Sequence, residues 1–156
     1  VPPPVPVGAV VTLHPQDRPF PKTVQLIPKI VTVGIGCRKN TPVSLIREQV
    51  LTALETAGIS PDSVRQAATI DLKAQEPGLL EFCREQGWEL ICYTAGELME
   101  AEGEFTPSAF VRQTTGVDNV CERAAVLASK GRLLLPKQAA NGVTAAAAAE
   151  EYLVKF

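Results

Sequence analysis

The chain has 156 residues, 46% of them hydrophobic, and a formal net charge of −2, which suits one domain with a buried core and an appendage. The near-neutral charge and the aromatic content of 5% argue against the basic faces and stacking platforms of nucleic-acid-binding proteins. No apolar run approaches the length of a membrane span and no signal peptide is visible, so the sequence predicts a cytoplasmic chain that does not bind a membrane.

The first 28 residues carry eight of the thirteen prolines and show no helical or alternating period. We interpret residues 1–28 as a linker or the remnant of a preceding domain, and residues 29–156 as the folded domain. The first residue is Val1 rather than Met, which indicates a fragment or a processed product. The single histidine, His14, lies in this arm, so no catalytic triad or multi-histidine metal site is expected in the domain.

A glycine-containing stretch from Lys29 to Pro42 is the best candidate for a functional site. The β-branched run over residues 30–35 predicts a parallel strand that is buried on both faces. Gly34 and Gly36 allow close backbone approach, and Thr41 followed by Pro42 predicts a helix start. The segment is therefore interpreted as a strand, a loop and a helix entry.

Two cations in this loop favour an anionic ligand. Arg38 and Lys39 follow the predicted strand, and open α/β sheets bind ligands at the carboxyl ends of their strands. The alternative is that the glycines serve only the turn and the cations are solvated. The G-x-G of residues 34–36 is not a dinucleotide fingerprint, because the position of the third glycine holds Lys39, and no P-loop occurs.

The four cysteines form no C-x-x-C pair, so the sequence predicts neither a zinc site nor a disulfide framework, and no cofactor. Cys37 is not expected to be a structural metal ligand. The helix start and Arg38 beside it would favour a lowered pKa and a reactive thiol.

Helices and strands alternate along the rest of the chain, with Gly58 and Gly87 as helix ends. The second helix is expected to bury Leu79, Leu80 and Cys83. The predicted helices are residues 43–57, 77–86, 94–99 and 117–129, and the predicted strands after the first are 64–71, 88–93, 132–135 and 143–147.

Charged side chains follow the second strand and begin the last helix. Asp71, Lys73 and Glu76 leave one strand end together, although a helix start would explain Glu76 equally. Glu122 lies three residues after Asn119, a spacing that is also typical of a reciprocal cap between a side chain and the backbone. Both functional and structural roles stay open for these residues.

Only residues 136–141 separate the last two predicted strands, which is too short for a crossover helix. The sequence therefore predicts an α/β fold of three α/β/α layers with a mostly parallel, five-stranded mixed sheet, whose last strand is antiparallel at an edge. The alternative is a helix, because the alanine run 145–149 has high helix propensity.

Four motifs occur in order along the chain: Val33–Arg38, Thr69–Lys73 with Glu76, Gly116–Glu122, and Lys137 followed by Gly142–Thr144. Together they resemble the carboxy-terminal domain of the CbiG/CobE family of cobalamin biosynthesis, from about residue 28 onward. The resemblance implies an α/β/α domain of a cobalt-precorrin-5A hydrolase, which opens a lactone on the corrin ring and releases acetaldehyde. The alternative is a non-catalytic corrinoid carrier or chaperone like the stand-alone CobE proteins, and a third reading is a generic phosphate-binding α/β domain.

The implied ligand, a cobalt-corrinoid intermediate, carries acetate and propionate groups around an apolar ring, so its site needs cations and an apolar floor. Arg38 and Lys73 are expected to converge on one cleft. The implied partner is the amino-terminal portion of the same protein; a homodimer and protein ligation of cobalt stay open. The candidate substrate-binding residues are Gly34, Gly36, Cys37, Arg38, Lys73, Lys137 and Thr144, and the candidate catalytic bases are Asp71, Glu76 and Glu122.

Overall fold

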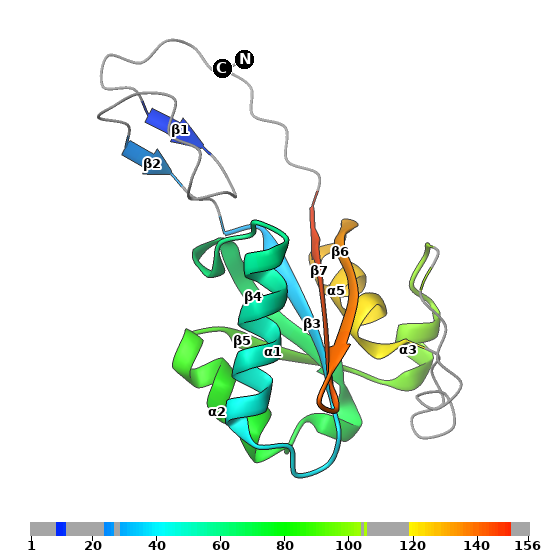
Figure 1. Cartoon of the computed structure of the whole chain (residues 1–156). Coiled ribbons are helices and arrows are strands. Elements are labelled where there is room, and N and C mark those ends of the chain that lie inside the picture. The colour runs from blue at the N-terminus through cyan, green and yellow to red at the C-terminus, as the bar shows by residue number, and fades with distance from the viewer. Residues whose placement is uncertain (1–8, 12–23, 27–28, 104, 106–118, 151–156) are drawn as a thin grey trace.

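The computed structural model describes residues 9–11, 24–26, 29–103, 105 and 119–150. Its main feature is a five-stranded sheet between two layers of helices (Figure 1). The strand order is β5-β4-β3-β7-β6, and the strands are β3 (Val31–Cys37), β4 (Val64–Ile70), β5 (Glu89–Tyr93), β6 (Arg132–Ala140) and β7 (Val143–Ala149).

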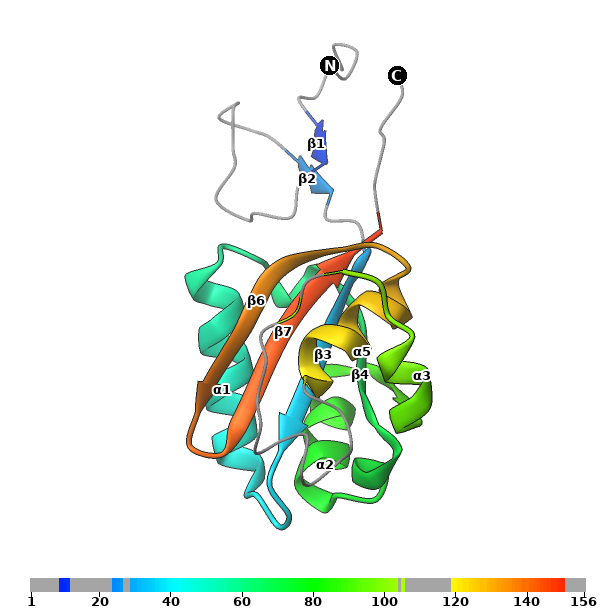
Figure 2. The same cartoon turned by 90° about the vertical axis from the view of Figure 1, so that its right-hand side faces the viewer.

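The helices pack on both faces of this sheet, α1 and α2 on one and α3 and α5 on the other (Figure 1, Figure 2). Their bounds are α1 (Val43–Thr56), α2 (Pro77–Gln86), α3 (Ala95–Met99) and α5 (Val120–Ser129), with 3-10 turns η1 (Pro61–Ser63) and η2 (Asp71–Lys73). In the proline-rich arm, β1 (Ala9–Val11) and β2 (Val24–Leu26) form a short parallel pair that the sequence did not predict. His14 lies outside the described residues.

The predicted fold class is confirmed. Strands β3, β4 and β5 are parallel, and β7 runs antiparallel to both β3 and β6. The alanine run is a strand, longer than expected, because burial between two layers outweighs intrinsic helix propensity. The antiparallel hairpin lies at one side of the sheet as predicted.

The order within this hairpin differs from the prediction. The edge strand is β6, and the last strand, β7, lies next to β3. The physical reason is burial: nearly all of β7 is buried and its small alanines fit between two helical layers, whereas most of β6 is exposed or partly buried and only its Leu135 is buried. Pro136 in β6 lacks an N–H donor, which also suits an edge strand.

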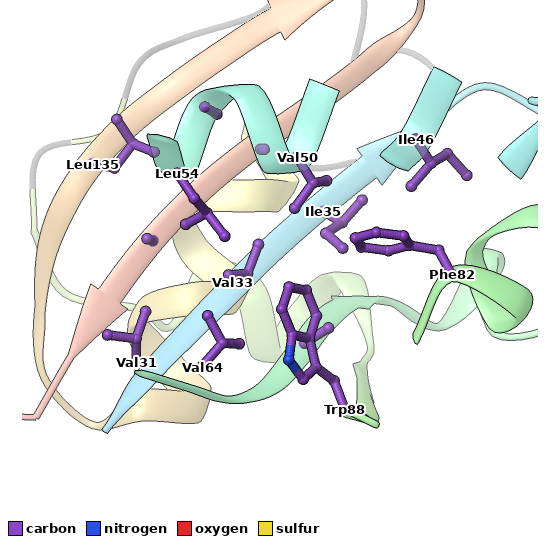
Figure 3. Close-up of a cluster of buried hydrophobic side chains, with 14 of the residues drawn as sticks. Val31, Val33, Ile35, Ile46, Val50, Leu54, Val64, Phe82, Trp88 and Leu135 are labelled. Atoms are coloured by element: carbon purple, nitrogen blue, oxygen red, sulfur yellow. The ribbon is translucent and has the colours of Figure 1, made fainter. Parts of the chain in front are cut away.

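The larger core cluster lies between the sheet and the helices α1 and α2 (Figure 3). Phe82 of α2 is fully buried and meets Trp88 edge to face, with ring centroids 5.4 Å apart. Leu80 was predicted to belong to this apolar stripe but is 40% exposed. The stripe therefore consists of Leu79, Phe82 and Cys83.

On the other face, α5 lies unusually close to β3. A Cβ atom built on Gly34 would lie 1.7 Å from the carbonyl oxygen of Cys121 and 3.1 Å from the Cβ of Ala125. Gly34 therefore serves the packing of the helix on the strand, because no other side chain fits there. This contact brings the amino end of α5 to the carboxyl end of β3.

Candidate cationic cavity

A cavity of about 580 Å³ opens at the carboxyl ends of β3 and β4. Four cationic side chains line it, and no carboxylate is among the lining residues. The complete lining is Gly36, Cys37, Arg38, Lys39, Ile70, Lys73, Asn119, Val120, Cys121, Lys137, Ala139, Ala140, Asn141, Gly142, Val143 and Thr144.

Four separate segments bring these residues together. The ends of β3 and β4 supply Cys37 and Ile70, η2 supplies Lys73, and the amino end of α5 supplies Asn119. The turn between β6 and β7 closes the remaining side, next to the end of β3 (Figure 2). Because a helix amino end carries a partial positive charge, the cations and α5 together favour an anionic ligand.

The turn that carries Arg38 and Lys39 is held from several directions. The Arg38 N–H donates to the carbonyl of Gly142 at 3.1 Å, and the Thr41 hydroxyl donates back to the Arg38 carbonyl at 2.6 Å. Asn40 adopts a φ of 61°, and its N–H donates to Oε2 of Glu76 at 2.9 Å. Glu76 therefore ties the start of α2 to the cationic turn.

Glu122 is 1% exposed and lies behind the cavity wall. The side-chain amide of Asn119 donates to its Oε1 at 2.8 Å, and the backbone N–H of Lys137 donates to its Oε2 at 2.7 Å. The Glu122 N–H donates in turn to Asn119 Oδ1 at 2.8 Å. The helix is capped by Asn119 as expected, and the Glu122 carboxylate accepts from an amide side chain and from the backbone of a neighbouring strand.

The two thiols in the cavity wall are poor nucleophiles near neutral pH. Burial raises the pKa of the Cys37 thiol to about 11, with Lys73 opposing the rise and Glu76 adding to it. Burial likewise raises the pKa of Cys121 to about 12, against a hydrogen bond with Thr144. The lowered pKa that the sequence suggested for Cys37 is therefore wrong, because desolvation outweighs the opposing effect of Lys73 on this pKa.

The structure brings together six of the ten residues that the sequence singled out, including Arg38 and Lys73, which line the same cavity. The six are Gly36, Cys37, Arg38, Lys73, Lys137 and Thr144. The other four, Gly34, Asp71, Glu76 and Glu122, do not line it. Asp71 is exposed at the start of η2, directly after Ile70 of the cavity wall.

The sequence reasoning missed the hairpin residues from Ala139 to Val143 as part of the site. The sequence signal for them is the dipeptide Asn141-Gly142, which is typical of a type I′ hairpin turn. In the structure both residues adopt the positive φ angles that such a turn requires, 54° and 79°. This dipeptide predicts the tight turn that places the hairpin beside Arg38.

The described residues hold no group of three or more His, Cys, Asp or Glu side chains that could bind a metal ion. Among these same residues, no helix is long and apolar enough to span a membrane.

The fold and the cavity define the chain as an α/β domain with a cationic, carboxylate-free site at the carboxyl ends of its parallel strands. The family model described as "Cobalamin synthesis G C-terminus" matches residues 31–148. The chain therefore belongs to this family.

Similar proteins support this assignment. Over 120 residues the chain is 37% identical to the cobalt-precorrin-5A hydrolase of Salmonella typhimurium, covering 77% of this chain and 34% of the relative. It is 32% identical to Protein CobE of Sinorhizobium sp, covering 76% of this chain and 79% of the relative. Thus the chain spans about a third of the length of the hydrolases that it matches, but most of CobE.

Two solved structures share the fold. The crystal structure of CobE, a protein of the cobalamin biosynthetic pathway, superposes with a TM-score of 0.71 at 28% identity, covering 79% of this chain and 92% of that one. The crystal structure of the cobalamin biosynthesis protein chiG from Agrobacterium tumefaciens gives a TM-score of 0.61 at 27% identity. This match covers 79% of this chain and 100% of the chiG chain.

Proposed function

We propose that this chain acts in the cytoplasm in cobalamin biosynthesis, as the carboxy-terminal part of a cobalt-precorrin-5A hydrolase, and that its cavity binds the carboxylates of the corrin intermediate. The observation that carries this proposal is the combination of family membership with four cations and no carboxylate in the cavity wall. A macrocycle edged by acetates and propionates matches such a wall, because cations bind carboxylates through charge-assisted hydrogen bonds.

The reaction adds water to a lactone carbonyl and releases acetaldehyde. Among the three candidate bases, Glu76 and Glu122 already accept hydrogen bonds from Asn40 and Lys137. We therefore assign the base, if this domain supplies it, to Asp71, which lies between the cavity residues Ile70 and Lys73. Donors near the reacting carbonyl would be Lys73 and the amides of Gly36 and Cys37.

Two observations favour the alternative, a corrinoid carrier. The cavity wall contains no carboxylate, and the similarity to CobE extends over most of that chain. In this case the domain binds the corrinoid, and the amino-terminal portion of the longer relatives carries out the chemistry.

The deciding experiment mixes the chain with cobalt-precorrin-5A and measures both binding and acetaldehyde. Release of acetaldehyde by the chain, abolished by Asp71→Asn, supports the hydrolase with its base in this domain. Tight binding with release only after the amino-terminal portion is added supports the carrier. Binding of a sugar phosphate or nucleotide without corrinoid binding contradicts both. Sedimentation of the same samples shows whether the partner is a second copy of the chain.

A further inference from the structure

The edge strand β6 contains an irregularity at Lys137. Leu135 pairs with Ala147 and Gln138 pairs with Ala145, so that Pro136 and Lys137 together lie opposite Ala146. Two residues opposite one define a β-bulge, which adds a residue to one strand and re-aims the side chains that follow.

This bulge decides which face of the sheet Lys137 occupies. Leu135 packs into the core on the α1 side (Figure 3). In a regular strand, a residue two positions later would share that face. Lys137 instead lines the cavity with Asn119 and Val120 on the α5 side. The extra residue therefore moves the lysine from the core face to the cavity face.

The bulge leaves a donor that needs another acceptor. Pro136 has no N–H, and the N–H of Lys137 donates to Oε2 of Glu122 at 2.7 Å. Asn119 holds the same carboxylate through Oε1 at 2.8 Å, and accepts the Glu122 N–H at 2.8 Å. The first turn of α5 is thereby bonded to the bulged residue of β6.

We propose that Glu122 is a positioning residue: with Asn119, it anchors the bulge that turns Lys137 into the cavity. The part of this proposal that concerns ligand binding rests on the proposed function. A buried carboxylate bonded to a strand amide fixes the backbone from which Lys137 extends, and so sets where one carboxylate of the ligand binds.

The first test needs no ligand. In the wild-type chain, NMR should show the Lys137 amide shifted downfield and protected from exchange, with contacts from the Lys137 side chain to Val120. Glu122→Gln should remove the protection and these contacts, because the glutamine oxygen would accept from the Asn119 side chain and its NH₂ group, a donor, would then face the Lys137 N–H. The control is Glu97→Gln at the cap of α3, where Glu97 accepts from the Thr94 N–H at 2.9 Å; it should leave the Lys137 amide unchanged.

A double variant that exchanges the amide and the carboxylate of Asn119 and Glu122 distinguishes loss of the anchoring hydrogen bond from loss of folding. In the double variant Asn119→Asp with Glu122→Gln, the glutamine amide can donate to the aspartate while its oxygen still accepts from Lys137. We expect this variant to regain the protected Lys137 amide. An unchanged amide in Glu122→Gln, or no recovery in a folded double variant, would overturn the anchor.

The second test measures binding of a cobalt corrinoid with free acetate and propionate side chains. Glu122→Gln and Lys137→Met should each weaken binding about tenfold, and their combination should bind no worse than Lys137→Met alone, since Glu122 acts through Lys137. A hundredfold loss in the combination would show independent roles and contradict the proposal. Failure of the wild-type chain to bind would reject the proposed function, while the amide measurement still decides the anchor.

Discussion

At the scale of single residues, neighbouring elements decide roles that the local sequence leaves open. Gly34 and Gly36 have the same spacing as part of a nucleotide-binding loop, yet only Gly36 lines the cavity. Gly34 lies under the carbonyl of Cys121, a residue far along the chain. The local sequence predicts that the backbone needs glycine here, but not that a helix is the reason.

Gly34→Ala should destabilise the chain strongly. The Cβ of the new alanine would lie 1.7 Å from the carbonyl oxygen of Cys121. This backbone group belongs to a packed helix and cannot move aside as the end of a flexible side chain can. We expect a loss of at least about 2 kcal/mol in the free energy of unfolding, measured by urea denaturation. Gly96→Ala is the matched control, because its Cβ would come no closer than 3.9 Å to another residue; it should be neutral or stabilising. Equal effects in the two variants would contradict the packing role.

The raised pKa of Cys37 predicts a particular pH dependence of its alkylation. Since burial raises this pKa from 9.0 to about 11, the reactive thiolate is scarcer than in an ordinary thiol at any pH below that value. In a Cys92→Ser background, iodoacetamide should modify Cys37 slowly at pH 7, with a rate that still rises above pH 9. The double variant Cys37→Ser, Cys92→Ser gives the background from the two buried thiols. A rate that levels off below pH 9 would mean that the cations dominate.

At the scale of elements, periodicity and turn residues predict most of the fold. The helix and strand patterns between residues 30 and 93 match α1, α2 and the parallel strands to within a residue or two. The strand β6 was predicted too short, because Pro136 and the bulge interrupt the alternation of its carboxyl half. Which hairpin strand joins β3 depends on burial between two layers, a tertiary property that no local pattern contains.

The turn of this hairpin gives a prediction at the same scale. Gly142 has a φ of 79°, and a Cβ on it would lie 3.1 Å from Cδ of Arg38. Gly142→Ala should therefore lower the free energy of unfolding by about 1 to 2 kcal/mol through the positive φ. Asn141→Gly, which keeps the backbone conformation accessible at a φ of 54°, should change stability little. Thermal melts of both variants test this, and an equal drop in the two would count against the type I′ turn.

At the scale of the whole molecule, the sheet brings together four segments from distant parts of the sequence. The rule that ligands bind at the carboxyl ends of parallel strands predicts from the sequence alone that Arg38 and Lys73 lie near each other. It could not place the amino end of α5 against them, since that depends on the Gly34 contact, nor Lys137, since that depends on the bulge. These long-range features complete the cavity wall.

If the cavity binds the carboxylates of a corrin intermediate, removal of a lining cation should weaken binding without unfolding the domain. Arg38→Ala and Lys73→Ala should each raise the Kd for a cobalt corrinoid with free carboxylates about tenfold, which is the cost of losing one charge-assisted contact in a partly desolvated site. Melting temperatures should change little, because neither side chain belongs to the core clusters. Arg65→Ala is the control: Arg65 is an exposed cation near the amino end of β4, away from the cavity, and its loss should leave the Kd unchanged.

The same measurements separate specific carboxylate binding from general attraction by charge. A corrinoid with amidated side chains should bind the wild-type chain more weakly, and its Kd should respond little to Arg38→Ala or Lys73→Ala. Because charge attraction is screened by salt, the wild-type Kd for the carboxylated corrinoid should rise with ionic strength more steeply than that of either variant. Should Arg38→Ala and Lys73→Ala instead lower the melting temperature and leave both Kd values unchanged, the two cations would have structural roles and the ligand would bind elsewhere.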